Sequence, residues 1–205
     1  YNNVIHTTDL TTPNSRAAAG VTVWMAPGGG KASYAYNNLI YNTTAANVFA
    51  LASDAGTVCP GSGAVGSVEL YNNTIECGLD SNPAGQCFAP PAALNATIRN
   101  NHFITSGSPI GGAPLAQSNN ITQTKAQAAT QGYALANLFV PTTASGASVN
   151  VGTTINCPSC TGITTAFNTV TRPQGGTWDV GAYEFSGTGT PPPAPPTPSP
   201  PLGRV

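Results

Sequence analysis

The chain has 205 residues, of which 40% are hydrophobic, and it contains 23 glycines and 19 prolines. This length predicts one principal domain with a modest core. Only 6% of the residues are charged and the net charge is −1, which excludes the basic surface that attracts nucleic acid. No stretch reaches the roughly 18 consecutive apolar residues of a membrane-spanning helix, so we expect no membrane span.

An Asn-Asn pair recurs four times in the first half of the chain. The second asparagine of the pair advances in steps of 35, 35 and 28 residues, at Asn3, Asn38, Asn73 and Asn101. Internal repeats of this length indicate a solenoid. The segments at 33–36, 66–71 and 96–99 alternate small or apolar with polar residues, which is typical of short β-strands.

Each pair suits a tight corner between two strands, because asparagine tolerates left-handed backbone angles and can hydrogen-bond the turn. In parallel strands that stack about 4.8 Å apart, one inward asparagine can bond to the next. We therefore expect an asparagine ladder formed by Asn3, Asn38, Asn73 and Asn101.

The cysteines and glycosylation motifs favour an oxidising, extracellular setting, secreted or at the cell surface. Five cysteines allow at most two intrachain disulfides; we expect Cys157 to pair with Cys160, and two of Cys59, Cys77 and Cys87 to pair with each other. Four Asn-x-Ser/Thr motifs are candidate glycosylation sites, at Asn42, Asn72, Asn95 and Asn120.

The pattern changes after residue 105. Residues 124–131 are rich in good helix formers and are followed by Gly132, which predicts a short helix. Residues 141–166 return to turn-forming residues and predict one or two irregular coils. Residues 186–205 are rich in glycine and threonine and then in proline, as in linkers. The prediction is therefore a folded domain over 1–185 and a tail over 186–205.

Residues 171–185 read Thr-Arg-Pro-Gln-Gly-Gly-Thr-Trp-Asp-Val-Gly-Ala-Tyr-Glu-Phe. This segment resembles the closing signature of bacterial surface proteins of the pectate-lyase-like superfamily, those with a choice-of-anchor domain, and residues 126–142 are similar to the stretch that precedes it. The resemblance implies an all-β fold, a right-handed parallel β-helix (solenoid) that is the C-terminal part of a longer one. It does not define an activity, because the superfamily contains lyases, hydrolases and non-catalytic adhesin-like proteins.

The closing segment is predicted to cap the open end of the last coil. Its aromatic side chains would cover apolar surface, and its arginine would pair with Asp179 or Glu184. The predicted cap residues are Arg172, Trp178, Asp179, Tyr183 and Phe185.

Catalytic chemistry finds little support. Only seven residues are Asp or Glu, and no acid recurs at the matching position of a neighbouring repeat, so a carboxylate site across stacked coils is not predicted. The segment 27–31 lacks the first glycine and the final Ser or Thr of a phosphate-binding loop. We expect no catalytic residue, no metal and no cofactor.

The sequence thus predicts a non-enzymatic extracellular structural or cell-surface protein. The repeat begins directly at Tyr1, so we expect an open coil edge that, with the proline-rich tail, serves head-to-tail self-association into filaments; the alternative partner is a surface anchor. The alternative is a polysaccharide partner. It would be a binding module or a fragment of a β-helix lyase or hydrolase, with a sugar-stacking strip made by Tyr34, Tyr36, Tyr41 and Tyr71.

Overall fold

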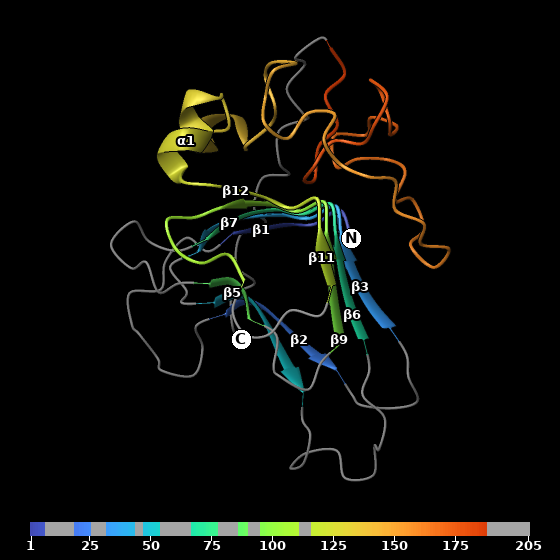
Figure 1. The fold of residues 1–205 in the computed structure, drawn as a ribbon. Helices are drawn as coiled ribbons and strands as arrows, with labels where there is room; N and C mark the ends of the chain where they lie inside the picture. Colours follow the sequence, from blue (N-terminus) through green and yellow to red (C-terminus); the bar gives the residue numbers. More distant parts are fainter. Residues whose placement is uncertain are drawn as a thin grey trace, which may run out of the picture.

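The computed structural model describes residues 1–6, 19–25, 32–43, 47–53, 67–77, 86–89, 95–110 and 116–187. In these residues the strands form three parallel sheets. Seen along the stack, the five-stranded sheet lies between the three-stranded sheet and the C-terminal segment, and the four-stranded sheet flanks it (Figure 1).

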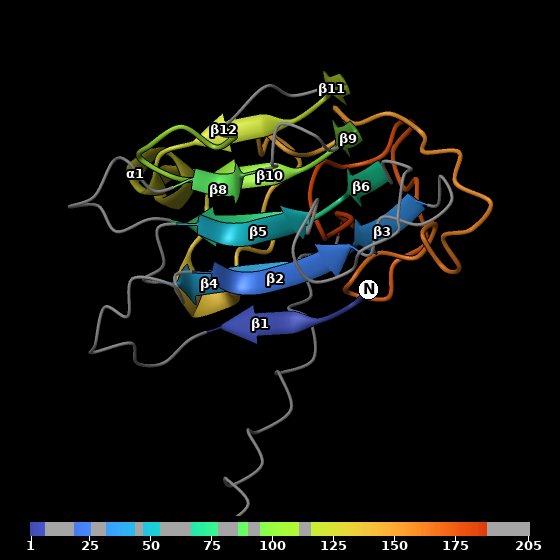
Figure 2. The ribbon, with the colours of Figure 1, turned by 90° about the horizontal axis from the view of Figure 1, so that it is seen from below.

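Within each sheet, neighbouring strands are two or three strands apart in chain order. The five-stranded sheet has the order β1 (Val4–His6), β4 (Leu39–Thr43), β7 (Thr74–Cys77), β10 (His102–Ile104), β12 (Ile121–Gln123). The four-stranded sheet has the order β11 (Ala116–Ser118), β9 (Asn95–Arg99), β6 (Ser67–Tyr71), β3 (Ala32–Tyr36). The three-stranded sheet has the order β2 (Ala19–Met25), β5 (Asn47–Ser53), β8 (Gln86–Ala89). Turned by 90°, the molecule shows β1 at one end of the stack and β11 and β12 at the other (Figure 2).

The register of the five-stranded sheet is fixed by the Asn-Asn pairs. The residue that directly follows each pair lies opposite its counterpart in the next strand: Val4 faces Leu39, Leu39 faces Thr74, Thr74 faces His102, and His102 faces Ile121. A slip by one residue would turn every side chain to the other face of the sheet.

The five-stranded sheet is buried on both faces. Because side chains alternate along a strand, Ile40 enters a core with Phe88 between the sheets, while its neighbour Leu39 packs on the outer face with Tyr133 and Tyr183. All four residues of β7 are buried for the same reason. The outer face therefore needs a cover, and the C-terminal segment provides it.

This covering segment contains the two short helical elements of the described residues, α1 (Lys125–Thr130) and a 3₁₀ turn at Leu135–Asn137. A capping box begins α1: the Thr124 hydroxyl accepts from the Gln127 backbone N–H at 3.1 Å, and the Gln127 side chain accepts from the Thr124 N–H at 2.9 Å. Gly132 follows with φ +84°, a left-handed angle that suits glycine after a helix.

The predicted fold class, a right-handed parallel β-helix (solenoid), is wrong by the architecture found. The described residues form mostly parallel strands in two larger sheets of five and four strands, with little helix, and no solenoid is found in them. The physical reason is that the repeat does not continue. Residues 124–187 lie beside the sheets and cover one face of them. The prediction instead placed further coils and a cap at the end of a stack.

Candidate functional site

A row of asparagine side chains, buried at Asn38, Asn73 and Asn101, runs through the strand corners. Nδ2 of each asparagine donates to Oδ1 of the next, at 3.0 Å from Asn3 to Asn38, 2.9 Å from Asn38 to Asn73, 2.8 Å from Asn73 to Asn101 and 3.1 Å from Asn101 to Asn120. The backbone N–H of each donor residue bonds to the same oxygen. The row satisfies amides that would otherwise be costly to bury.

Asn120 is a member of this row that the sequence analysis did not identify. Its Asn-x-Ser/Thr motif predicts only a glycosylation site, and its step of 19 residues from Asn101 is well short of the earlier steps. The available signal was Ser118-Asn119-Asn120-Ile121, which repeats the pair followed by an apolar residue.

The first asparagine of each pair makes the corner. Asn2, Asn37, Asn72, Asn100 and Asn119 all have left-handed backbones, with φ between 52° and 56°. This conformation is strained for most residues but accessible to asparagine. The corner turns the chain from one sheet into the next and aims the second asparagine into the row.

These corner asparagines also hold the C-terminal segment. Asn37 donates to the Thr165 carbonyl at 2.8 Å, and Asn119 donates to the Val151 carbonyl at 3.3 Å. Asn100 both donates to the Thr153 carbonyl and accepts from the Thr153 N–H. The segment therefore runs lengthwise along the corners.

A buried ion pair anchors this segment further. Arg172 contacts Glu184 at 3.1 Å, and its guanidinium also donates to the carbonyls of Asp179, Gly181 and Tyr183. Desolvation lowers the pKa of Arg172 to about 10, against the opposing pull of the Glu184 charge. The guanidinium is a structural tie, because it joins three main-chain carbonyls of this segment to the Glu184 carboxylate and to the Asn37 side chain at a strand corner.

Asp179 lies in the same turn. Its carboxylate accepts from the backbone N–H groups of Asn150 at 2.7 Å and Phe185 at 2.6 Å. Burial raises the pKa of Asp179 to about 6, although both hydrogen bonds act in the opposite direction.

The predicted cap residues are brought together, but on the side of the stack. The Gly181 N–H donates to the Asn100 carbonyl at 2.7 Å and the Ala182 N–H to Thr74 Oγ1 at 2.9 Å, both in the middle of the molecule. Trp178 packs with Tyr36 and Tyr71 at the corners, and the Tyr183 ring lies over the outer face of the five-stranded sheet. Phe185 is half-buried at the end of the segment.

Two disulfides are present in the described chain. Cys77–Cys87 joins β7 to β8, and Cys157–Cys160 closes a short loop. Cys59 lies outside the described residues.

The glycosylation candidates fall in three situations. Asn72 is fully buried, so the folded chain leaves no room for a glycan there. Asn120 is half-buried, and its Nδ2 donates to the Ile98 carbonyl at 2.8 Å. Asn42 and Asn95 lie in β4 and β9, but their side chains are outside the described part of the structure.

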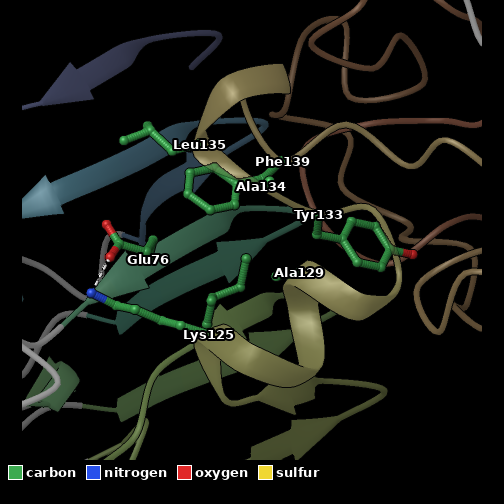
Figure 3. A pocket seen from close by; sticks show the side chains of 8 residues that line it. Glu76, Lys125, Ala129, Tyr133, Ala134, Leu135 and Phe139 are labelled. Atoms are coloured by element: carbon green, nitrogen blue, oxygen red, sulfur yellow. Dashed lines mark ion pairs between the residues drawn. The ribbon is translucent and has the colours of Figure 1, made fainter.

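An apolar hollow lies between α1 and the outer face of the five-stranded sheet (Figure 3). It measures about 320 Å³, and Ile104, Leu135 and Phe139 contribute to its walls. The Lys125 ammonium and the Glu76 carboxylate form an ion pair of 2.6 Å at its side.

His102 is a buried histidine beneath this region. Its Nε2 bonds to the Gln123 side chain at 2.8 Å, and its ring meets Tyr133 edge-on at 4.9 Å. Desolvation lowers the pKa of His102 to about 4, so the ring is neutral near pH 7. Its hydrogen-bond partner, the Gln123 amide, is neither acidic nor nucleophilic, so this bond is a packing interaction.

Within the ranges that the structure describes, no group of three His, Cys, Asp or Glu residues is placed to hold a metal ion. The same residues include no helix that is long and apolar enough to cross a membrane. No protein-family model, curated protein or solved structure matches the chain.

Proposed function

We propose that this protein is a non-enzymatic extracellular structural or cell-surface protein that associates with itself head to tail into filaments. The observation that carries the proposal is the asparagine row, which ends at Asn120 beside the exposed and uncharged strand β11. A chain that stacks strands by such a repetitive bond can extend the same bonding into a neighbour.

The use of the charged groups supports a structural role. Arg172, Asp179 and Glu184 are each buried and committed to bonds within the C-terminal segment. Groups held in this way stabilise a turn and are shielded from a substrate. The two disulfides support an extracellular setting, since they persist mainly in oxidising compartments. The resemblance of residues 171–185 to a signature of bacterial surface proteins supports the same location.

The tyrosine side chains do not favour the polysaccharide alternative. Tyr36, Tyr41 and Tyr71 are buried, and Tyr34 is half-buried. Tyr36 is covered by the Tyr1 ring, with which it stacks at 4.8 Å. A sugar-stacking strip needs exposed ring faces, so we do not propose one.

Electron microscopy of the purified chain, under non-reducing conditions in physiological salt, tests the proposal. We expect unbranched fibres whose axial repeat matches the length of one stack of strands. A field of dispersed single particles at every protein concentration would contradict self-association. Incubation with a panel of polysaccharides, followed by a co-sedimentation assay, would then be the next experiment.

A further inference from the structure

Two buried side chains carry unpaired polar atoms where the strand corners meet the C-terminal segment. Asn72 is fully buried, and so is the side chain of Arg172. Among the described residues, the buried side-chain atoms without a hydrogen-bond partner are Nδ2 and Oδ1 of Asn72 and Nε of Arg172. A buried donor or acceptor that stays unpaired is costly to the fold, so these three atoms call for an explanation.

Asn72 differs in this respect from the corner asparagines on either side of it. Asn37 bonds directly to the main chain of Thr165, and Asn100 bonds directly to the main chain of Thr153. All three corners have the same left-handed backbone, with φ of 52° at Asn72 against 55° and 56° at its neighbours. The Asn72 amide is therefore directed toward the same C-terminal segment, but it makes no direct bond to it.

The Arg172 guanidinium lies across this corner. Its Nη2 is 3.5 Å from Asn37 Oδ1 and donates to the Gly181 carbonyl at 2.9 Å. The Gly181 N–H in turn donates to the Asn100 carbonyl at 2.7 Å. Asn37 and Asn100 belong to the corners before and after Asn72, so the contacts of Arg172 span the corner between them. This places the unpaired Nε–H and the unpaired amide in the same part of the interior.

We propose that one internal water molecule binds between Asn72 and Arg172, where it accepts from the Arg172 Nε–H and hydrogen-bonds to the Asn72 amide. Water fits this set of groups because it both donates and accepts, and the set contains N–H donors together with one carbonyl oxygen. Internal waters make about three bonds to polar groups that lack protein partners. The site is independent of the self-association proposed above. It ties the C-terminal segment to the corner at Asn72, as direct bonds do at the neighbouring corners.

The charges around the site select a neutral occupant. The Arg172 charge is matched by Glu184 at 3.1 Å, and the carboxylate of Asp179 adds a second negative charge close by when it is ionised. An anion such as chloride would therefore enter a region whose net charge is zero or negative. A metal cation would meet the N–H donors of Asn72 and Arg172, while both carboxylates already accept from backbone N–H groups.

Nuclear Overhauser effects between water and the ¹⁵N-labelled, unmodified chain test the site. A water that stays bound while the molecule tumbles should give through-space transfer to Arg172 Hε and to the Asn72 side-chain N–H groups, and a rotating-frame experiment separates this transfer from proton exchange by its sign. Asn100 is the internal control, because it is equally buried and its Nδ2 donates to the Thr153 carbonyl at 2.6 Å. No transfer at Arg172 and Asn72, or equally strong transfer at Asn100, would overturn the proposal.

A crystal of the unmodified chain grown in sodium bromide identifies the occupant. We expect electron density for a water within hydrogen-bond distance of both Arg172 Nε and the Asn72 side chain, and no anomalous bromide signal at that place. An anomalous peak there would show that the site binds an anion and would overturn the assignment of water. Direct protein acceptors for the Arg172 Nε–H and the Asn72 amide, with no solvent between them, would also overturn it.

Discussion

At the scale of single residues, burial decides how the ionisable groups behave. His102 is neutral when folded, because its pKa is about 4 in place of the ordinary 6.5. The pKa of Asp179 is shifted in the other direction, to about 6 from its ordinary value of 3.8. Acidification therefore lowers the stability of the folded chain through His102 and raises it through Asp179. A variant that lacks one of the two groups is needed to measure each contribution.

We predict that His102 makes the folded chain less stable in acid. Between pH 6.5 and about 4 the unfolded chain takes up a proton that the buried ring does not, so the free energy of unfolding should fall by about 3 kcal/mol across this window and stay level below it. His102→Gln keeps a hydrogen-bonding group toward Gln123 but has no titrating ring. Urea unfolding at a series of pH values should show the difference between the two chains shrinking as the pH falls from 6.5 to 4.

The Asp179 contribution is common to both chains and cancels in that difference. On its own, a raised carboxyl pKa makes the folded chain gain stability as the pH falls from about 6 toward 4. A difference that stays constant with pH would contradict the assignment of a neutral, buried His102.

The buried ion pair supplies a second prediction at this scale. Arg172→Met leaves Glu184 charged and buried with one fewer partner, and such a loss costs about 3–5 kcal/mol. The double variant Arg172→Met with Glu184→Gln removes the charge as well and should recover part of the loss. Urea denaturation of the three chains at pH 7 measures both steps. A double variant less stable than Arg172→Met alone would contradict a charge-based explanation.

At the scale of elements, the asparagine row joins five strand corners, and its members differ in burial. Asn73 is fully buried, whereas Asn3 is exposed at one end of the row. Asn73 donates to Asn101 and to the Ala35 carbonyl, and its oxygen accepts from Asn38. The cost of losing a member should therefore depend on its position.

We predict that Asn73→Ala destabilises the fold by about 2–4 kcal/mol, because it leaves buried donors and acceptors of both neighbouring strands without partners. Asn3→Ala is the matched control and should cost less than about 1 kcal/mol, since water can replace its bonds. Thermal and urea unfolding of the two variants make the comparison. Equal losses at the two positions would contradict a role for burial in the row.

The sequence predicts these elements unevenly. The recurrence of the pair at Asn38, Asn73 and Asn101 predicts corners and parallel bonding, because asparagine is one of the few residues suited to both. It does not predict the fifth pair, since the step to Asn120 is short, and it does not predict which face the C-terminal segment covers. That placement depends on contacts such as Ala182 with Thr74, which are separated by 108 residues.

At the scale of the whole molecule, the low charge of the chain determines how it should associate. Only 6% of the residues are charged, and the edge residues 116–123 carry no charge. Association through backbone groups and amides has no long-range electrostatic component to screen.

We therefore predict that the extent of assembly changes little with ionic strength. Light scattering at a fixed protein concentration should give the same mean mass between about 0.05 and 0.5 M NaCl, a range over which the Debye length falls several-fold. Dissociation of the assemblies as salt rises would show that charged groups hold the copies together, and would contradict an interface made by the uncharged edge.

The spacing of the asparagine pairs has a consequence for how such a chain can change over generations. Steps of 35, 35, 28 and 19 residues all lead to the same alignment of neighbouring strands. Alignment is set locally at each corner, so insertions and deletions between corners are decoupled from it. A difference in length between two corners is therefore compatible with the same alignment, provided that the strands between those corners keep their own pairing.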